Sequence, residues 1–323
     1  MIAPGSGETP YQHAPALGLT HRLLGRFHVT GIFWYRFAYW GFTRVPSWTE
    51  WLSVPCAAAF FFIVLTRIRR ALASNLEPVL GATGMVGRWL RAWRTIWTFA
   101  WCFAERYRRL ADPDRFRSTL DGAAHWDQLT RSSSGAILVT AHIGPWETGA
   151  QFGAIESQRR VHVVREQEMD PRAQEFVRKI LARTGPNYVA HFSGTDPMLS
   201  LTLARALKNG EIVALQGDRP RAGGRTVVVN VCGRRWPLPI GPAVLARESG
   251  VPIYPIFNFR EGRFQMRVVI RPPIMVAKTT DRTTDIAEAL HRLGSEIEWA
   301  IRERPHQWFC FRQLWSDAAS RRA

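Results

Sequence analysis

Residues 136–153, AILVTAHIGPWETGAQFG, predict a strand, a tight turn and a helix in direct succession. The first five residues are apolar or β-branched and indicate a buried strand that ends at Thr140. Pro145 suits the first turn of a helix, because its fixed φ fits there and its missing N–H is not needed. His142 then lies in the turn, and Glu147 lies in the first helical turn.

This placement of His142 and Glu147 suggests acid–base chemistry. Five residues apart on one continuous helix, the two side chains would point in different directions. Across a strand-to-helix turn, both can converge at the carboxyl end of the strand, where open α/β sheets have their active sites. A carboxylate there can hold one imidazole nitrogen and leave the other as general base for an alcohol or amine. The alternative is a purely structural histidine.

From Gly135 onward, short β-rich runs alternate with helical patterns. The predicted strands are residues 136–140, 161–164, 187–192, 211–216, 226–231, 252–259 and 264–270. One predicted helix begins at Asp196 and Pro197, ends at Gly210, and has Met198, Leu199, Leu203 and Leu207 on its inner face. Another begins near Thr283 and stops at Pro305. This alternation predicts an α/β fold with a mixed, mostly parallel central sheet flanked by helices.

The region before this sheet differs in composition. Residues 1–28 are rich in Pro, Gly and polar residues and predict a flexible lead-in without a cleavable signal. Residues 29–110 are aromatic and basic, and the run from Trp51 to Thr66 carries no charge. As a helix that run is about 24 Å long, which is marginal for a bilayer core of about 30 Å. It is either inserted in a membrane or a buried core helix.

A second pattern in this region is helical. From Arg88 to Leu110, aromatic residues recur at steps of three or four, and arginines lie beside them; the stripe is Trp89, Trp93, Trp97, Trp101, Ala104 and Tyr107. Such a helix either lies at a membrane interface or packs its stripe on the core of the protein. We expect residues 29–110 to be membrane-associated helices ahead of a catalytic domain at 111–316 and a basic tail at 317–323.

The chain has 43 basic and 26 acidic residues and a net charge of +17, which implies an anionic counterpart such as a nucleic acid, a membrane or a phosphorylated substrate. All but three of the basic residues are arginines, which bind phosphate bidentately. The four cysteines form no C-x-x-C pair, so we expect a reducing compartment and metal-independent chemistry.

Several common motifs are excluded. G-x-S-x-G, H-E-x-x-H and the Walker phosphate loop do not occur in the sequence. The run from Gly81 to Gly87 has the spacing of a dinucleotide loop, but no strand precedes it, and we interpret it as a corner between two helices.

With its downstream blocks, the sequence resembles the lysophospholipid acyltransferase superfamily, in the branch of lipid A late acyltransferases and phosphatidylinositol mannoside acyltransferases. The resemblance covers roughly residues 30–315. It rests on these blocks: His142-x-x-x-x-Glu147, Gln216-Gly-Asp218-Arg219, Leu238-Pro-Ile-Gly241-Pro242-Ala, Val251-Pro-Ile-Tyr-Pro255 and Pro305-His-Gln-Trp308-Phe. The Gly-Asp-Arg-Pro form of the second block and the basic run RAGGR at 221–225 depart from the better-known subfamilies, so the acceptor need not be a lipid A precursor.

The resemblance implies transfer of a fatty acyl group from a thioester, on acyl carrier protein or coenzyme A, to a hydroxyl of a lipid or glycolipid. His142 would deprotonate the acceptor and Glu147 would orient His142, with no further cofactor. The substrate- and phosphate-binding residues would include Asp218 and Arg219, together with a family arginine that is Arg178 or Arg183, or less readily Arg165. The expected location is the cytoplasmic face of a bacterial inner membrane. The alternatives are N-acylation of an amino lipid and a non-catalytic polyanion-binding membrane protein; no nucleic-acid module is visible.

Overall fold

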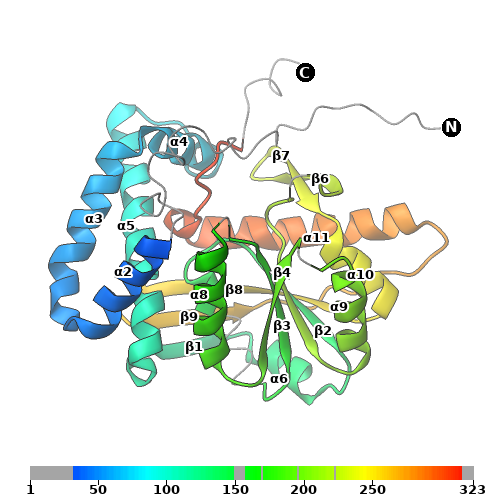
Figure 1. Ribbon diagram of the computed structural model, residues 1–323. Coiled ribbons are helices and arrows are strands. Elements are labelled where there is room, and N and C mark those ends of the chain that lie inside the picture. The colour runs from blue at the N-terminus through cyan, green and yellow to red at the C-terminus, as the bar shows by residue number, and fades with distance from the viewer. Residues whose placement is uncertain (1–31, 149–156, 169, 195, 222, 315–323) are drawn as a thin grey trace.

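The computed structural model describes residues 32–148, 157–168, 170–194, 196–221 and 223–314 (Figure 1). The expected lead-in at residues 1–28 and the expected basic tail at 317–323 lie outside these described residues.

A seven-stranded sheet forms the centre of the molecule, in the order β1-β9-β8-β2-β5-β3-β4. Its strands are β1 (Arg117–Asp121), β2 (Ala136–Thr140), β3 (Val161–Glu166), β4 (Tyr188–Ser193), β5 (Ile212–Gln216), β8 (Ile253–Gly262) and β9 (Gln265–Ile270). Strands β8, β2, β5, β3 and β4 are parallel, while β9 pairs antiparallel with β8, and β1 pairs parallel with β9. The predicted α/β fold with a mixed, mostly parallel sheet is confirmed.

Two strands, β1 and β7, were not predicted, and one predicted strand lies outside the central sheet. Strand β1 lies at the edge with alternating exposure, so it lacks the apolar run of a buried strand. The predicted strand at 226–231 exists as β6 (Thr226–Val231), but it pairs only with β7 (Arg234–Pro239) in a separate hairpin. Strand β7 contains two arginines and two prolines, so its sequence lacks the pattern typical of a strand.

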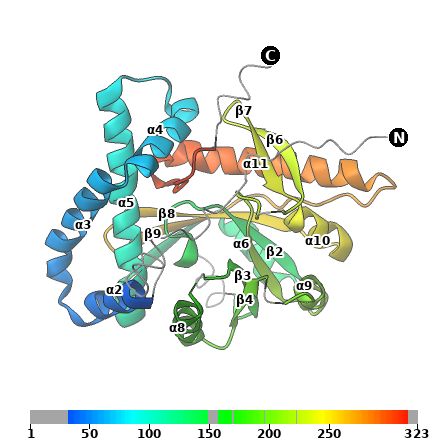
Figure 2. The same ribbon diagram turned by 45° about the horizontal axis from the view of Figure 1, so that its top comes forward.

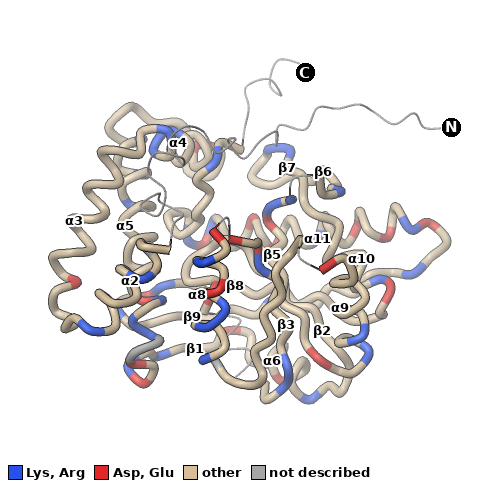
Figure 3. Tube along the Cα trace, viewed as in Figure 1, with Lys and Arg blue, Asp and Glu red and all other residues tan. Residues whose placement is uncertain are grey.

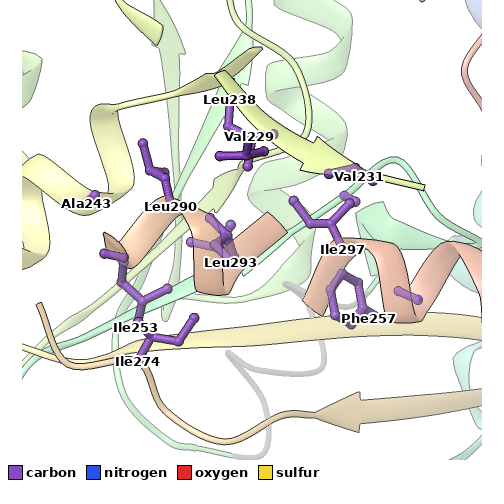
Figure 4. Packing of buried hydrophobic residues seen from close by; sticks show 14 of the residues in the cluster. Val229, Val231, Leu238, Ala243, Ile253, Phe257, Ile274, Leu290, Leu293 and Ile297 are labelled. Carbon is purple, nitrogen blue, oxygen red and sulfur yellow. The ribbon is translucent and has the colours of Figure 1, made fainter. Parts of the chain in front are cut away.

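Helices cover both faces of the sheet. On one face lie α9 (Leu199–Lys208), α10 (Gly241–Ser249) and α11 (Arg282–Glu303), and on the other lie α6 (Ala123–Arg131) and α8 (Pro171–Leu181). Figure 4 shows Val229, Val231 and Leu238 of the β6–β7 hairpin packed near Leu290, Leu293 and Ile297 of α11. The hairpin is therefore anchored on a core helix.

The helix predicted from Asp196 to Gly210 is present as α9, and its inner face is mostly as predicted. Leu203 and Leu207 are buried, and Leu199 is partly buried. Met198 is exposed, so its predicted inward position is wrong. It precedes the first turn of α9, and its backbone N–H donates to the Asp196 carboxylate instead.

Among the described residues, four helices precede the sheet: α2 (Ile32–Arg44), α3 (Glu50–Val64), α4 (Thr66–Leu80) and α5 (Met85–Ala111). The described residues also contain short 3₁₀ turns: η2 (Ser47–Thr49), η3 (Pro113–Arg115), η4 (Ala182–Thr184) and η5 (Pro305–Gln307). Residues 81–84 join α4 to α5, so the glycine-rich run at Gly81 is a corner between helices as predicted.

Helix α3 is not a core helix. Only Glu50, Val54 and Ala58 are buried in it, and these face α5, whereas bulky apolar side chains such as Trp51 and Phe60 are exposed. The stretch Ser47–Val64 has the length and apolar composition of a membrane-crossing helix. The alternative of a buried core helix is therefore wrong for this segment.

The aromatic stripe of α5 changes character along the helix. Near its start Trp89 is exposed, whereas Trp101, Ala104 and Tyr107 near its end are buried. Trp101 packs against Trp51 of α3, with ring centroids 5.5 Å apart. The end of the stripe thus packs inside the protein, and only its beginning faces outward.

Buried ion pairs join these helices to the sheet. Glu50 accepts hydrogen bonds from Arg108 of α5, at 2.6 Å, and from Arg263 beyond β8, at 3.0 Å. Arg260 of β8 donates twice to Glu105 of α5, each time at 2.9 Å. Arginine forks suit such sites, because they satisfy both carboxylate oxygens at once.

Glu50→Ala removes the only acidic partner of Arg108 among the described residues and leaves a buried guanidinium unpaired. We expect a loss of about 3–5 kcal/mol of unfolding free energy. Glu77→Ala, which removes an exposed partner of Arg88, should cost no more than about 1 kcal/mol. Thermal unfolding of both variants in detergent solution measures this difference, and equal losses would contradict the structural role given to Glu50.

Candidate active site

A cavity of about 470 Å³ opens at the carboxyl edge of the sheet, where β2, β3 and β5 end. Apolar side chains from five strands line its interior, including Leu138, Val163, Ala214 and Ile256. His142 lies at its polar rim, in the turn that follows β2. The cavity therefore combines an apolar interior with one imidazole at the position that open α/β sheets use for ligands.

Asp218 fixes the position of His142 by two hydrogen bonds. Its carboxylate has no exposed surface and accepts a hydrogen bond from the ring Nδ1 of His142 at 2.8 Å and from the backbone N–H of the same residue at 3.2 Å. The two residues meet because β2 and β5 are parallel neighbours, with Thr140 opposite Gln216. Each lies two residues beyond its strand, so sheet register brings them together.

The charge of Asp218 is maintained in this buried position. Burial alone would raise the pKa of its carboxyl, but the charges of His142 and Arg219 and the hydrogen bonds from His142 outweigh burial and lower the pKa to about 2. An ionised carboxylate on Nδ1 selects the tautomer in which Nδ1 carries the proton.

The other ring nitrogen of His142, Nε2, has no hydrogen-bond partner among the described residues. The ring packs against Trp146, with centroids 5.2 Å apart, and Trp146 in turn packs against Phe309. The aromatic contact fixes the ring plane, so Nε2 is free to act on a ligand in the cavity.

Glu147 does not hydrogen-bond to His142, and its contact with the imidazole is electrostatic only. Its carboxylate lies between Arg106 of α5, at 2.5 Å, and Arg165 of β3, at 2.7 Å. Burial would raise the pKa of Glu147, but these two arginines lower it, with a smaller contribution from His142. The guanidinium groups attract the carboxylate more strongly than a neutral imidazole does, and Asp218 already occupies Nδ1.

The candidate arginines are not all at the cavity. Arg165 lines it, whereas Arg178 of α8 is exposed and pairs with Glu175, and Arg183 donates to the Tyr39 hydroxyl of α2. The ranking of Arg178 and Arg183 above Arg165 is therefore corrected by their positions. A charge buried on a strand is hard to distinguish from a surface charge when the sequence contains so many arginines.

Arg219 stabilises the site but is not among the residues that line the cavity. Its Nε lies 3.4 Å from Asp218, and its Nη2 donates to the carbonyl of Phe309 at 2.7 Å. Phe309 donates its own N–H to the carbonyl of His142 at 2.9 Å. The closing block of the sequence, which contains Trp308 and Phe309, thus holds the histidine turn in place.

Gly144 allows the histidine turn to lie close to the backbone of β8. Its φ is +54°, and an added Cβ would lie 2.1 Å from the carbonyl oxygen of Asn258. Its N–H donates to the carbonyl of Gln307 at 2.8 Å. No other residue type fits this position without moving the backbone.

Sequence reasoning missed three contributors to the site. Arg106 was interpreted only as part of a cationic helix face. The hydrogen bond between Asp218 and His142 was not predicted. Asn258 is a buried amide that lines the cavity, and its place in an apolar strand did not indicate this role. No group of three or more His, Cys, Asp or Glu side chains within the described ranges is arranged as metal ligands.

Gly144→Ala should destabilise the fold by at least about 2 kcal/mol, because the new methyl group meets the Asn258 carbonyl and φ must leave the left-handed region. Gly241→Ala is the matched control, since nothing lies within 4 Å of its added Cβ and alanine favours the start of α10. Differential scanning calorimetry compares the two, and a control that loses as much as Gly144→Ala would refute the steric argument.

Asp218→Asn should change how stability depends on pH. A carboxyl whose pKa falls from 3.8 to about 2 on folding stabilises the protein fully above pH 4 or so, and this contribution is lost as the pH falls towards 2. The difference in unfolding free energy between wild type and variant should therefore shrink by about 2 kcal/mol from about pH 5 to pH 2. Urea titrations at several pH values measure it, and a constant difference would show that Asp218 is not held ionised.

Comparison with known proteins shows the family of the chain. The model of the family described as bacterial lipid A biosynthesis acyltransferase matches residues 29–317. Phosphatidylinositol mannoside acyltransferases from two strains of Mycobacterium tuberculosis are each 26% identical over 231 residues, which is 70% of this chain and 67% of the relative. These matches confirm the resemblance found in the sequence and set aside a non-catalytic polyanion binder. Since the family match spans most of the chain, the protein belongs to the bacterial lipid A biosynthesis acyltransferase family and is a lipid or glycolipid acyltransferase.

Proposed function

We propose that the protein transfers a fatty acyl group from an acyl carrier protein or coenzyme A thioester to a hydroxyl of a lipid or glycolipid, with His142 as general base. The observation that carries the proposal is the buried Asp218 carboxylate on Nδ1 of His142, with Nε2 free at the rim of an apolar cavity. This is the arrangement that general-base catalysis needs.

The reaction proceeds in two steps. Nε2 of His142 takes the proton of the acceptor hydroxyl while its oxygen attacks the thioester carbonyl carbon. The tetrahedral intermediate then collapses, the C–S bond breaks, and the thiolate receives the proton from Nε2. Asp218 stabilises the imidazolium between these steps, because its charge lies 2.8 Å from Nδ1. No acyl-enzyme forms.

The cavity accounts for the other demands of the reaction. Its apolar interior, with Leu138, Val163 and Ile256, suits a fatty acyl chain. Arg165 lines the same cavity and supplies positive charge for the developing oxyanion or a substrate phosphate. Glu147 acts through Arg165, which it holds together with Arg106, and through its charge near His142.

Residues 29–110 provide the membrane-associated part, and residues 111–316 the catalytic part. Exposed aromatic side chains on α2, α3 and the start of α5, such as Trp40, Trp51 and Trp89, support contact with a bilayer. Exposed arginines follow α3, which suits the anionic cytoplasmic face of a bacterial inner membrane.

The test is acyl transfer by purified full-length protein in detergent, with labelled acyl thioester and an extracted lipid acceptor. His142→Ala and Asp218→Asn should each lower kcat/KM by about 10²- to 10⁴-fold, because each removes the base or its correct tautomer. His291→Ala, an exposed histidine on α11, is the control and should keep normal turnover.

Near-normal turnover of His142→Ala would overturn the proposal. Free fatty acid released as fast without acceptor as with it would indicate a hydrolase. Mass spectrometry of the product separates an ester from the amide expected of an N-acyltransferase, and it identifies the acceptor.

A further inference from the structure

A basic segment leads away from the active site. Between Asp218 and Glu248 the sequence has six arginines and no acidic residue. Arg219 and Arg247 are engaged in the fold, through Phe309 and Asp285 respectively. The other four are exposed, and their side chains have no hydrogen-bonding or ionic partner among the described residues; we call them the hairpin arginines, Arg221, Arg225, Arg234 and Arg235. Figure 3 shows blue and no red along the β6–β7 hairpin.

The hairpin holds two of these arginines, Arg234 and Arg235, on a fixed support. Its inner side packs on α11, and the backbone N–H of Cys232 at its tight turn donates to Glu298 of α11 at 2.7 Å. Arg234 and Arg235 follow this turn directly, on the strand β7. Their guanidinium groups therefore extend from a rigid element, which lowers the entropic cost of binding a partner.

The basic surface reaches the rim of the cavity. An added Cβ at Gly194 would lie 3.2 Å from Nη2 of Arg221 and 3.9 Å from Oε1 of Gln167. Gln167 lines the cavity together with His142. Arg221 therefore lies near a residue that lines the cavity, and a partner bound there is close to the site of acyl transfer.

The character of this surface argues against a membrane. A bilayer-binding surface combines cations with bulky apolar groups, and such groups are exposed on α2 to α5. On the loop and hairpin only Val228 is an exposed large apolar residue among those described. Figures 1 and 2 both show α2 and α3 on the opposite side of the molecule from β6 and β7.

The surface also does not suit a small nucleotide donor. None of the hairpin arginines lines the cavity at His142 or the smaller cavity beside Glu147 and Arg106. Small ligands bind in concave sites, whereas exposed charges on a projecting element steer and orient a protein of opposite charge.

We propose that the hairpin arginines dock an acidic carrier protein that delivers the acyl thioester to the cavity. This inference rests on the proposed acyl transfer and names the donor. The carrier approaches from the β6–β7 side, and the exposed apolar side chains of α2 to α5 leave the opposite side of the molecule to the lipid. Separate approaches let both substrates be present at once.

The test compares two donors, a bacterial acyl carrier protein loaded with a hexadecanoyl group and hexadecanoyl-pantetheine, on full-length protein in detergent. Arg234→Glu with Arg235→Glu should lower carrier affinity and kcat/KM with the loaded carrier by at least about tenfold. The kcat/KM with hexadecanoyl-pantetheine should stay unchanged. The control is Arg117→Glu with Arg205→Glu, exposed positions on β1 and α9 with the same change in net charge, and it should alter neither value more than about twofold.

Several results would overturn the inference: unchanged use of the carrier by the hairpin variant, an equal loss with both donors, or wild-type protein that transfers from hexadecanoyl-pantetheine but binds no carrier. In the last case the proposed function stands.

Loss of binding to phosphatidylcholine–phosphatidylglycerol vesicles, with carrier binding intact, would assign the hairpin to the membrane. Carrier binding is measured directly, so it remains informative if the wild type transfers from neither donor, a result that would defeat the proposed function alone.

Discussion

The candidate active site depends on one buried negative charge. Asp218 is fully buried, and within the described residues its carboxylate meets only the ring and backbone of His142 and the guanidinium of Arg219. A charge in such a place is tolerable only when hydrogen bonds and cations compensate the loss of water. The two parallel strands, the histidine turn and the closing segment are all arranged so that this compensation is complete.

The two buried carboxylates of the site bind different partners. Asp218 is hydrogen-bonded to the imidazole of His142, while Glu147 forms ion pairs with Arg106 and Arg165. Because each carboxylate has its own cationic or hydrogen-bonding partners, neither competes for the other's. The helix α5 thereby contributes a side chain to the site, although it is far from His142 in the sequence.

The sequence allowed most of the central sheet to be predicted, since buried parallel strands such as 136–140 and 212–216 are continuous apolar runs. It did not reveal β1 or β7, whose residues are polar or contain proline. It placed His142 in the turn after β2, but it did not reveal the contact between the imidazole and Asp218. Nearness in sequence favoured Glu147, whereas the pairing of β2 with β5, a long-range property, brings Asp218 to the ring.

The last turns of α5 also bear on how the protein can be handled. Glu105, Arg106 and Arg108 are bound to Arg260, Glu147 and Glu50 respectively. The helical region is therefore not a detachable anchor that could be trimmed to yield a soluble enzyme. Removing α5 would deprive Glu147 of one of its two arginines and leave Arg260 without its carboxylate, so a shortened form would lose part of the candidate site.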